Sequence, residues 1–468
     1  MPGKRKITID ALTELGANKL AELLLAEAAR NRKLKQAIDL AMSSKEGPVA
    51  LGAAVQKRLA RFAKSPSMPS YERGREIVVE FDGLRTMIVE NIGVENPRLA
   101  LDLLWELIEL HPSILELVDD SSGYAGDVFT AACYDLGPLA ERASIDPDAL
   151  AELVLQKITN NRYGIYDGLI RNLDRALGRE GLAKLRGLLL QRRQQYLTND
   201  KVVANAAGRH DFSLGGLSLA LRDIAEIEGD TDAFIDTYQD RDLTNPHFAN
   251  EIALQLLRAG RAEEALSYLD RAQPSEQNRN FGQLKWTDAR IAVLEALKRT
   301  DEAQALRLAF FQVHLSVSYL RAYLHELPDF EDFEAEQQAL DYVGGYANVH
   351  AALSFLVEWP AHERAAQLVL SRNREIDGDR YELLDPAASL IEGKYPLAAV
   401  LLRRALIEVT LRKARATRYK HAARHVREID SLNSQIRNYE NFETHDQFIE
   451  RLQKTHSRKT GFWPLLRD

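Results

Sequence analysis

The second half of the sequence repeats a short pattern that limits the possible folds. Residues 259–266 read Ala-Gly-Arg-Ala-Glu-Glu-Ala-Leu, and residues 297–303 read Leu-Lys-Arg-Thr-Asp-Glu-Ala, which ends on the equivalent alanine. Looser copies occupy residues 358–365 and 392–398. Each copy combines the expected end of one helix, a short turn, and a small residue where the next helix must pack closely. A period of roughly 34 to 45 residues with this pattern predicts an all-α fold, a TPR-like helical-repeat solenoid.

Helical periodicity also extends beyond these copies. Leu99, Leu103, Leu104 and Leu107 form a strong apolar stripe, and Pro97 stands at a favourable helix start. We expect three regions along the chain. They are an irregular N-terminal helical region over residues 1–200, TPR-like helical repeats over residues 201–395, and a basic C-terminal helix with a capping module over residues 396–468.

The C-terminal region is basic, whereas the rest of the chain is acidic. Residues 403–468 contain 15 Lys and Arg against 8 Asp and Glu, a net charge of +7; because the whole chain carries −8, residues 1–402 carry −15. No Gly or Pro interrupts residues 397–439, so we expect one long basic helix that ends near Arg437. A helical-repeat array needs a cap over its last apolar face. The expected aromatic cap contains Phe448, Phe462 and Trp463.

Several classes of protein are disfavoured by what the sequence lacks. The single Cys133 excludes an internal disulfide framework and is interpreted as a small core residue rather than a nucleophile. No apolar run approaches the roughly 20 residues of a membrane span, and no signal-type segment begins the chain, so we expect a cytoplasmic protein without a membrane partner. Phosphate-binding loops, nucleophile elbows and dinucleotide fingerprints are absent, so no cofactor and no catalytic residue is predicted.

Two polar clusters at expected helix junctions are candidates for binding a partner. Residues 119–127 combine three carboxylates with two hydroxyls and two glycines, which also suits an interhelix turn or, less well, a hard cation. Residues 160–168 place Asn, Arg and Tyr together, either as a recognition patch or as a packing junction between helices. The candidate partner-binding residues are Asp119, Asp120, Tyr124, Asp127, Arg162, Tyr163, Tyr166 and Asp167.

The cations of the basic helix could follow a phosphate backbone, neutralise the acidic body of the same chain, or remain solvated. The candidate nucleic-acid-binding residues are Arg412, Lys413, Arg415, Arg418, Lys420 and Arg424. His421 and His425 are four residues apart, the spacing of a metal-binding pair on one helix face, and His445, His456 or Glu428 could add a third ligand. The neighbouring arginines disfavour a divalent cation, so packing of these histidines against the terminal cap is the favoured interpretation.

Parts of the sequence resemble known families. Residues 119–129 and 163–170, and much of the chain from Leu12 onward, look like an uncharacterised family of bacterial helical proteins, a domain of unknown function. Residues 418–425, 445–448 and 456–463 resemble the C-terminal end of bacterial SWIM-type zinc-finger proteins. Those proteins hold their metal in a separate Cys/His segment. A chain with one cysteine lacks that zinc finger, so the resemblance implies no metal here.

Three functional hypotheses follow from the sequence. The first is a non-enzymatic scaffold or adaptor that binds a macromolecule, most simply a protein, along the concave face of a helical solenoid. The second is a nucleic-acid-associated protein that binds through the basic C-terminal helix. The third and weakest is a metal-dependent enzyme at His421 and His425.

Overall fold

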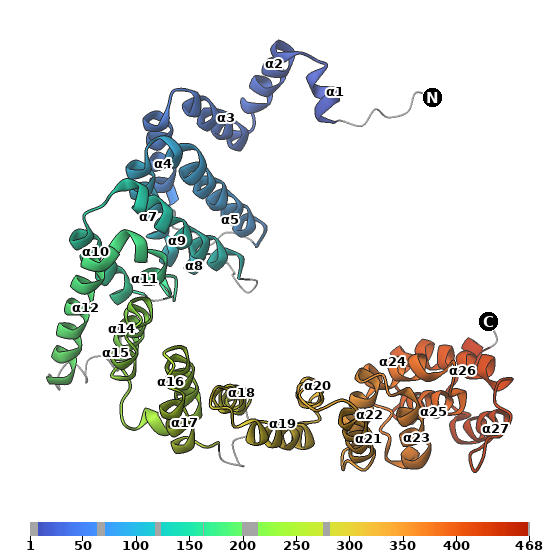
Figure 1. Ribbon diagram of the computed structural model, residues 1–468. Coiled ribbons are helices and arrows are strands. Elements are labelled where there is room, and N and C mark those ends of the chain that lie inside the picture. The colour runs from blue at the N-terminus through green and yellow to red at the C-terminus, as the bar shows by residue number, and fades with distance from the viewer. Residues whose placement is uncertain are drawn as a thin grey trace. The chain divides into compact units, whose positions relative to one another are not determined.

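Helices form the whole fold in the part of the chain that the structure describes. The computed structural model describes residues 8–62, 71–117, 123–161, 163–198, 214–274 and 281–466, and no strand occurs among them (Figure 1). No helix within these ranges is long and apolar enough to cross a membrane. The chain divides into two compact units, Met1–Leu243 and Thr244–Asp468, which are taken separately below.

The first unit contains helices of very different lengths. They are α1 (Ile9–Thr13), α2 (Ala17–Ala28), α3 (Arg32–Lys45), α4 (Pro48–Phe62), α5 (Tyr71–Thr86), the π-helix η1 (Met87–Ile92), α6 (Gly93–Glu95), α7 (Pro97–Ile108), α8 (His111–Leu117), α9 (Tyr124–Ala143), α10 (Pro147–Thr159), α11 (Leu169–Asn172), α12 (Asp174–Thr198), α14 (Leu214–Glu228) and α15 (Thr231–Ile235).

Helix α7 forms the centre of the first unit. Its start follows local rules, because Pro97 occupies the first turn and the Asn96 side chain accepts a hydrogen bond from the backbone N–H of Leu99. The apolar stripe expected there is confirmed: Leu103, Leu104 and Leu107 are fully buried. Helices α4 and α9 pack against α7.

Helix α9 is held at very short range by α11. A Cβ atom built on Gly137 would lie 2.1 Å from the carbonyl oxygen of Asn172, so only glycine allows this approach. Helices α5, α7, α8 and α12 also pack on α9. The close packing fixes the orientation of α9 and therefore the direction of its exposed face.

The second unit is built from successive helix pairs. Its elements, with the turn before it, are η2 (Asp242–Thr244), α16 (Pro246–Arg258), α17 (Ala262–Arg271), α18 (Phe281–Ala296), α19 (Thr300–His314), α20 (Val317–His325), α21 (Glu331–Gly344), α22 (Val349–Glu358), α23 (His362–Arg372), η3 (Asn373–Glu375), α24 (Tyr381–Ile391), α25 (Pro396–Arg412), η4 (Ala416–Arg418), α26 (Tyr419–Asn433), α27 (His445–His456) and η5 (Trp463–Leu466).

All four copies of the repeated pattern are turns between two helices, as expected. Three of the turns end the first helix with the same hydrogen bond, in which a backbone N–H reaches the carbonyl five residues back. These bonds join Arg261 to Leu256 (2.9 Å), Arg299 to Leu294 (2.8 Å) and Ala361 to Leu356 (2.9 Å). The small residues predicted to allow close packing of the second helix are all buried: Ala265, Ala303, Ala365 and Ala398.

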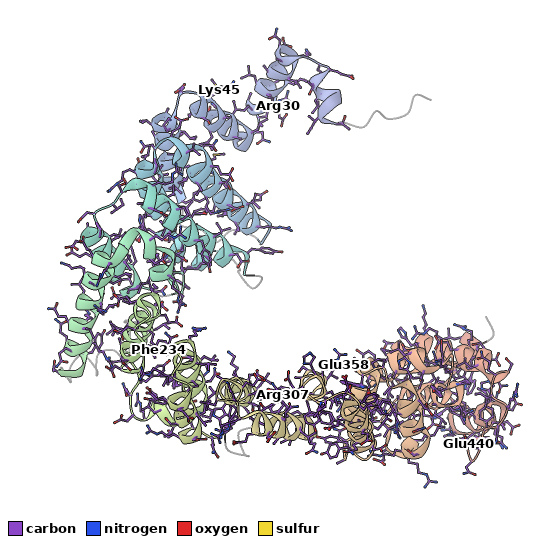
Figure 2. The ribbon with its side chains drawn as sticks, in the orientation of Figure 1. Arg30, Lys45, Phe234, Arg307, Glu358 and Glu440 are labelled. Carbon is purple, nitrogen blue, oxygen red and sulfur yellow. The ribbon has the colours of Figure 1, made fainter. Side chains whose placement is uncertain are left out.

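Polar contacts reinforce the helix pairs. Arg307 of α19, labelled in Figure 2, is buried and pairs with Glu295 of α18. Its second terminal nitrogen donates to the Gln304 side chain at 2.9 Å. One buried cation thus links the two helices of this pair.

The expected single helix from Leu397 to about Arg437 is wrong. Helix α25 ends at Arg412, and Ala414 adopts a left-handed conformation with φ of 52°. The backbone N–H of Arg415 then reaches the Thr410 carbonyl (3.1 Å), the same five-residue bond that ends the repeated helices. Helix α26 begins at Tyr419. The break needs no glycine, so the absence of Gly and Pro did not exclude it.

The rings of Tyr419, Phe462 and Trp463 pack together near the end of the described chain. Phe448 and Phe462 are buried, and the Trp463 and Tyr419 rings lie 5.1 and 5.9 Å from the Phe462 ring. The Trp463 indole N–H donates to the His456 carbonyl at 3.0 Å. These contacts hold the last turn of the chain against α26 and α27.

Candidate functional site

The turn between α10 and α11 is organised around a buried tyrosine. The Tyr166 hydroxyl donates to the Glu109 carboxylate (3.1 Å), and its backbone N–H donates to the Asn161 side chain (3.1 Å). Burial and the Glu109 charge both raise the pKa of Tyr166 above its usual range, so the hydroxyl stays protonated. Tyr166, expected to contact a partner, instead joins the turn to the end of α7.

His111 packs into the same junction and was not identified from the sequence. Its ring makes edge-to-face contacts with Phe129, Tyr163 and Tyr166 at centroid distances of 6.1, 5.9 and 5.5 Å. Burial lowers the pKa of His111 and favours the neutral ring, whose Nδ1–H donates to the Ile108 carbonyl at 2.9 Å. The ring therefore serves packing of the α7–α8 corner.

Cys133 lies in the core close to this junction. Its thiol donates to the Ile165 carbonyl at 3.3 Å, and burial raises the pKa of Cys133 to about 12. A thiol with so high a pKa is protonated at neutral pH and is a poor nucleophile. Its interpretation as a small core residue is confirmed.

The outer part of the turn reaches solvent. The side chain of Tyr163 is 44% exposed, and its hydroxyl donates to Glu116 of α8 at 3.3 Å. Asp167 is exposed and accepts a hydrogen bond of 2.7 Å from the Asn161 amide. The turn thus has a packed inner side around Tyr166 and an ordered outer side that carries Tyr163 and Asp167.

Helix α9 presents a second exposed surface. Tyr124 and Tyr134 are 63% and 64% exposed, and Asp127 is also exposed. With 3.6 residues per turn, these three side chains lie within about 80° of one another around the helix. We call Tyr124, Asp127 and Tyr134 the α9 face. Sequence reasoning missed Tyr134, although its ten-residue spacing from Tyr124 within one helix was a usable signal.

Three of the predicted partner-binding residues, Asp119, Asp120 and Arg162, lie outside the described residues. Of the predicted partner-binding residues that are described, four fall into two separate exposed groups. Tyr124 and Asp127 share α9, while Tyr163 and Asp167 share the α10–α11 turn.

Most of the predicted nucleic-acid-binding cations contact their own chain. Lys413 lies 2.7 Å from Asp379, and Arg415 pairs with the same carboxylate. Hydrogen bonds from Lys413, the larger contribution, and from Arg415 lower the pKa of Asp379 from 3.8 to about 2. Arg424 lies 2.6 Å from Asp385.

The remaining three cations differ in their surroundings. The Arg418 guanidinium lies 4.5 Å from the centre of the Tyr381 ring, a cation–π contact. Arg412 and Lys420 have exposed side chains and form no ion pair among the described residues. Four of the six cations are thus engaged within the second unit.

Buried charges join α24, α25 and α26. The Arg403 guanidinium is almost completely buried and lies 2.6 Å from Glu392 and 2.9 Å from Glu428. Partial burial alone would raise the pKa of Glu428, but hydrogen bonds from Arg403 and His425 outweigh this and lower it. The carboxylate is therefore ionised at neutral pH.

His421 and His425, the weak candidates for a metal-binding pair, do not form a pair; His425 belongs to a different group. His421 is exposed, whereas buried His425 lies 3.0 Å from Glu428 and 3.8 Å from Asp385. The ligand atoms of Asp385, His425 and Glu428 fall within 4.8 Å of one another, which is close enough to hold one ion.

The two arginines argue against a cation in this group. Arg403 and Arg424 already occupy oxygens of Glu428 and Asp385, so a divalent ion would have to displace them. Burial lowers the pKa of His425, and the neutral ring donates from Nδ1 to Glu428. The arrangement is that of an ion-pair network that fastens three helices.

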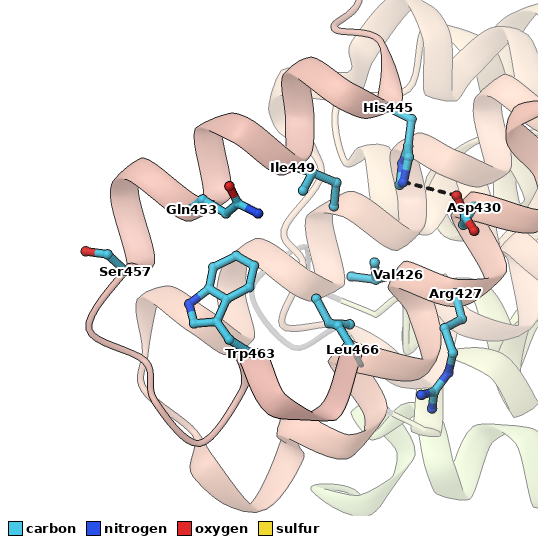
Figure 3. A pocket seen from close by; sticks show the side chains of 9 residues that line it. All are labelled: Val426, Arg427, Asp430, His445, Ile449, Gln453, Ser457, Trp463 and Leu466. Carbon is cyan, nitrogen blue, oxygen red and sulfur yellow. Dashed lines mark ion pairs between the residues drawn. The ribbon is translucent and has the colours of Figure 1, made fainter. Parts of the chain in front are cut away.

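A pocket of about 570 Å³ opens between α26, α27 and η5, as Figure 3 shows. Apolar side chains from all three elements converge on it: Val426, Ile449, Trp463 and Leu466. Arg427, Asp430 and His445 form part of its polar border. His445 is buried, its Nε2 lies 3.6 Å from Asp430, and its Nδ1 has no hydrogen-bond partner. We call this the C-terminal pocket.

Comparison with known proteins places the chain in a family. No curated protein matches the sequence. The family model that matches extends over residues 4–465, which is nearly the whole chain and includes the α9 face, the α10–α11 turn and every lining residue of the C-terminal pocket except Leu466. The chain therefore belongs to the family described as a family of unknown function, DUF6880.

Proposed function

We propose that this protein is a non-enzymatic scaffold, built as a TPR-like solenoid, that binds a protein partner through the α9 face together with Tyr163 and Asp167. The single observation that carries the proposal is the exposure of two tyrosines, Tyr124 and Tyr134, on one face of a rigidly packed helix. Tyrosine is enriched at binding sites because it combines a large apolar surface with a hydroxyl and loses little conformational entropy.

The packing of α9 supports this use of its outer face. The close approach of Gly137 to Asn172 and the buried Phe129 hold the helix from behind. A preformed surface binds more tightly than a flexible one, since less ordering is needed on association. The carboxylates of Asp127 and Asp167 make a partner with basic side chains the best match.

The groups that could carry chemistry support a non-enzymatic role. The thiol of Cys133 is protonated, His111 is neutral and enclosed by aromatic rings, and His425 is engaged by Glu428. A catalytic acid, base or nucleophile must reach its substrate. None of these three groups has that freedom.

Nucleic-acid binding through the basic segment is the alternative proposal. It rests on Arg412 and Lys420, whose exposed side chains form no ion pair within the described ranges. Two cations give weak binding with a modest salt dependence, because that dependence grows with the number of phosphates neutralised. A titration of labelled DNA and RNA at low salt tests it, and retention that is lost in Arg412→Ala/Lys420→Ala would favour it over the protein scaffold.

A comparison of variants tests the scaffold. Tagged wild type and Tyr124→Ser/Tyr134→Ser are expressed in the native host and cross-linked, and the captured proteins are quantified. A partner enriched by the wild type and lost from the double variant supports the proposal. Leu190→Ser is the control, because Leu190 is 48% exposed on another helix of the same unit. Equal capture by all three proteins argues against the α9 face. Fractionation of the same cells tests the cytoplasmic location that we propose for the scaffold.

A further inference from the structure

The first turn of α21, together with the two residues before it, presents two phenylalanines among acidic side chains. Residues 329–334 read Asp-Phe-Glu-Asp-Phe-Glu. The side chains of Phe330 and Phe333 are 87% and 63% exposed. None of the four carboxylates forms an ion pair within the described part of the chain. We call residues 329–334 the acidic aromatic turn.

Phe330 also has a strained backbone. Its φ of 77° lies in the left-handed region, where a bulky side chain is rarely found. Strain of this kind persists only where something else compensates it, and it concentrates at functional positions. The ring of Phe330 is 87% exposed and so gains little from packing within its own chain. A contact with another molecule is therefore the natural compensation.

The C-terminal pocket has the complementary chemistry. Val426, Ile449, Trp463 and Leu466 give it an apolar lining, and its volume of about 570 Å³ lies in the range of sites that enclose a ligand. Arg427 lines the pocket and uses one terminal nitrogen to donate to the Leu465 carbonyl. Its remaining N–H groups are able to meet a carboxylate.

Further features extend this complementarity. Lys454 and Arg458, near the end of α27, are exposed and form no ion pair in the described ranges. An occupant that carries an aromatic group flanked by carboxylates would fill the apolar space and pair with Arg427, Lys454 and Arg458.

We propose that the acidic aromatic turn of one copy docks into the C-terminal pocket of a second copy of this chain. Phe330, and behind it Phe333, enters the space between Ile449 and Trp463. The carboxylates of the turn face Arg427 and the cations at the end of α27. The contact uses no residue of the α9 face, so it stands independently of the proposed scaffold function.

A contact between two different surfaces has a structural consequence. Each copy keeps one unused turn and one unused pocket after pairing, so association continues head to tail unless the geometry closes a ring. The average mass in solution should therefore rise with concentration past that of a dimer. Salt should weaken the association, because the charges involved are exposed.

Sedimentation velocity of the full-length chain over a wide range of concentrations measures the state of association. Wild type is expected to associate, and Phe330→Ser/Phe333→Ser to remain a monomer. Leu390→Ser is the matched control, since Leu390 is 52% exposed elsewhere in the second unit, and it should associate like wild type. A wild-type chain that stays monomeric at every concentration overturns the proposal, as does association that the double variant retains.

Mixing two defective variants tests the pairing of turn and pocket. Ile449→Glu places a charge in the apolar lining of the pocket, and Arg427→Glu, a milder change that leaves the core intact, reverses the charge at its border; both variants keep the turn. Each should be monomeric alone. Mixed with Phe330→Ser/Phe333→Ser, whose pocket is intact, each should form a dimer and nothing larger, because only one productive contact remains. Association of a pocket variant by itself, or a mixture that stays monomeric while wild type associates, contradicts the contact.

Discussion

The buried guanidinium of Arg403 lies 2.9 Å from the carboxylate of Glu428 and joins α25 to α26. Glu392, at the end of α24, holds the other side of the same guanidinium at 2.6 Å. A cation within the basic segment therefore serves to fasten three helices. Lys413, Arg415 and Arg424 are also engaged within their own chain, because each forms an ion pair with an aspartate of the second unit.

Replacement of Arg403 should destabilise the second unit. Arg403→Met leaves Glu392 and Glu428 without their cation and should lower the free energy of unfolding by about 2–3 kcal/mol. This is less than for a fully buried pair, because both carboxylates keep part of their hydration. Denaturant unfolding of the full chain measures the change. Arg412→Met, at an exposed position, should stay within about 0.5 kcal/mol of wild type; equal effects of the two changes would rule out the structural role of Arg403.

Gly137 should tolerate no side chain. Gly137→Ala places a methyl group 2.1 Å from the Asn172 carbonyl oxygen, so α9 and α11 must move apart. The free energy of unfolding should fall by about 1–3 kcal/mol. Gly187→Ala is the control, because a Cβ atom at that helical position meets no atom within 4 Å. It should stabilise the protein by about 0.5–1 kcal/mol. Thermal unfolding distinguishes the two, and a neutral Gly137→Ala would contradict the close packing of α9.

The two tyrosines of the α10–α11 turn should respond differently to loss of their hydroxyl groups. Tyr166→Phe removes a buried bond to Glu109 and should cost about 1–2 kcal/mol of stability. Tyr163→Phe removes a longer, exposed bond to Glu116 and should change stability by less than about 0.5 kcal/mol. Chemical denaturation of both variants provides the measurement. The reverse order would mean that Tyr163, rather than Tyr166, holds the turn in place.

The pKa of Asp379 predicts a specific pH dependence. Because Lys413 and Arg415 lower this pKa from 3.8 to about 2 in the folded chain, the ionised carboxylate stabilises the fold at all pH values above about 4. That contribution is lost as the pH falls from about 4 to 2. The stability difference between wild type and Asp379→Asn should therefore be constant above pH 4 and shrink toward pH 2. A difference that does not change over this interval is incompatible with the lowered pKa.

Local patterns predicted the helix pairs of the second unit, whereas features set by tertiary contacts escaped prediction. The position of Ala265 or Ala303 follows from the turn before it, since the geometry of such a turn depends on neighbouring residues only. The end of α25 at Arg412 depends instead on a left-handed Ala414 and on Asp379, more than thirty residues earlier. No local signal distinguishes this alanine from those inside the helix.

The candidate sites show the same division. The clustering of polar residues at 160–168 was visible in the sequence, but the burial of Tyr166 and the exposure of Tyr163 depend on where α7 and α8 lie. The partnership of His425 with Asp385 connects residues forty positions apart. The spacing of residues along one helix suggested His421 as the partner of His425, because such spacing contains no information about the neighbouring helix.

Amide hydrogen exchange of the full-length chain, with and without a captured partner, locates the binding surface of the proposed scaffold. The partner should slow exchange along α9 from Tyr124 to Tyr134 and in the turn that carries Tyr163, and leave the basic segment from Arg412 to Arg424 unchanged. Protection confined to that basic segment, or no protection in the first unit, would mean that the partner does not bind at the α9 face.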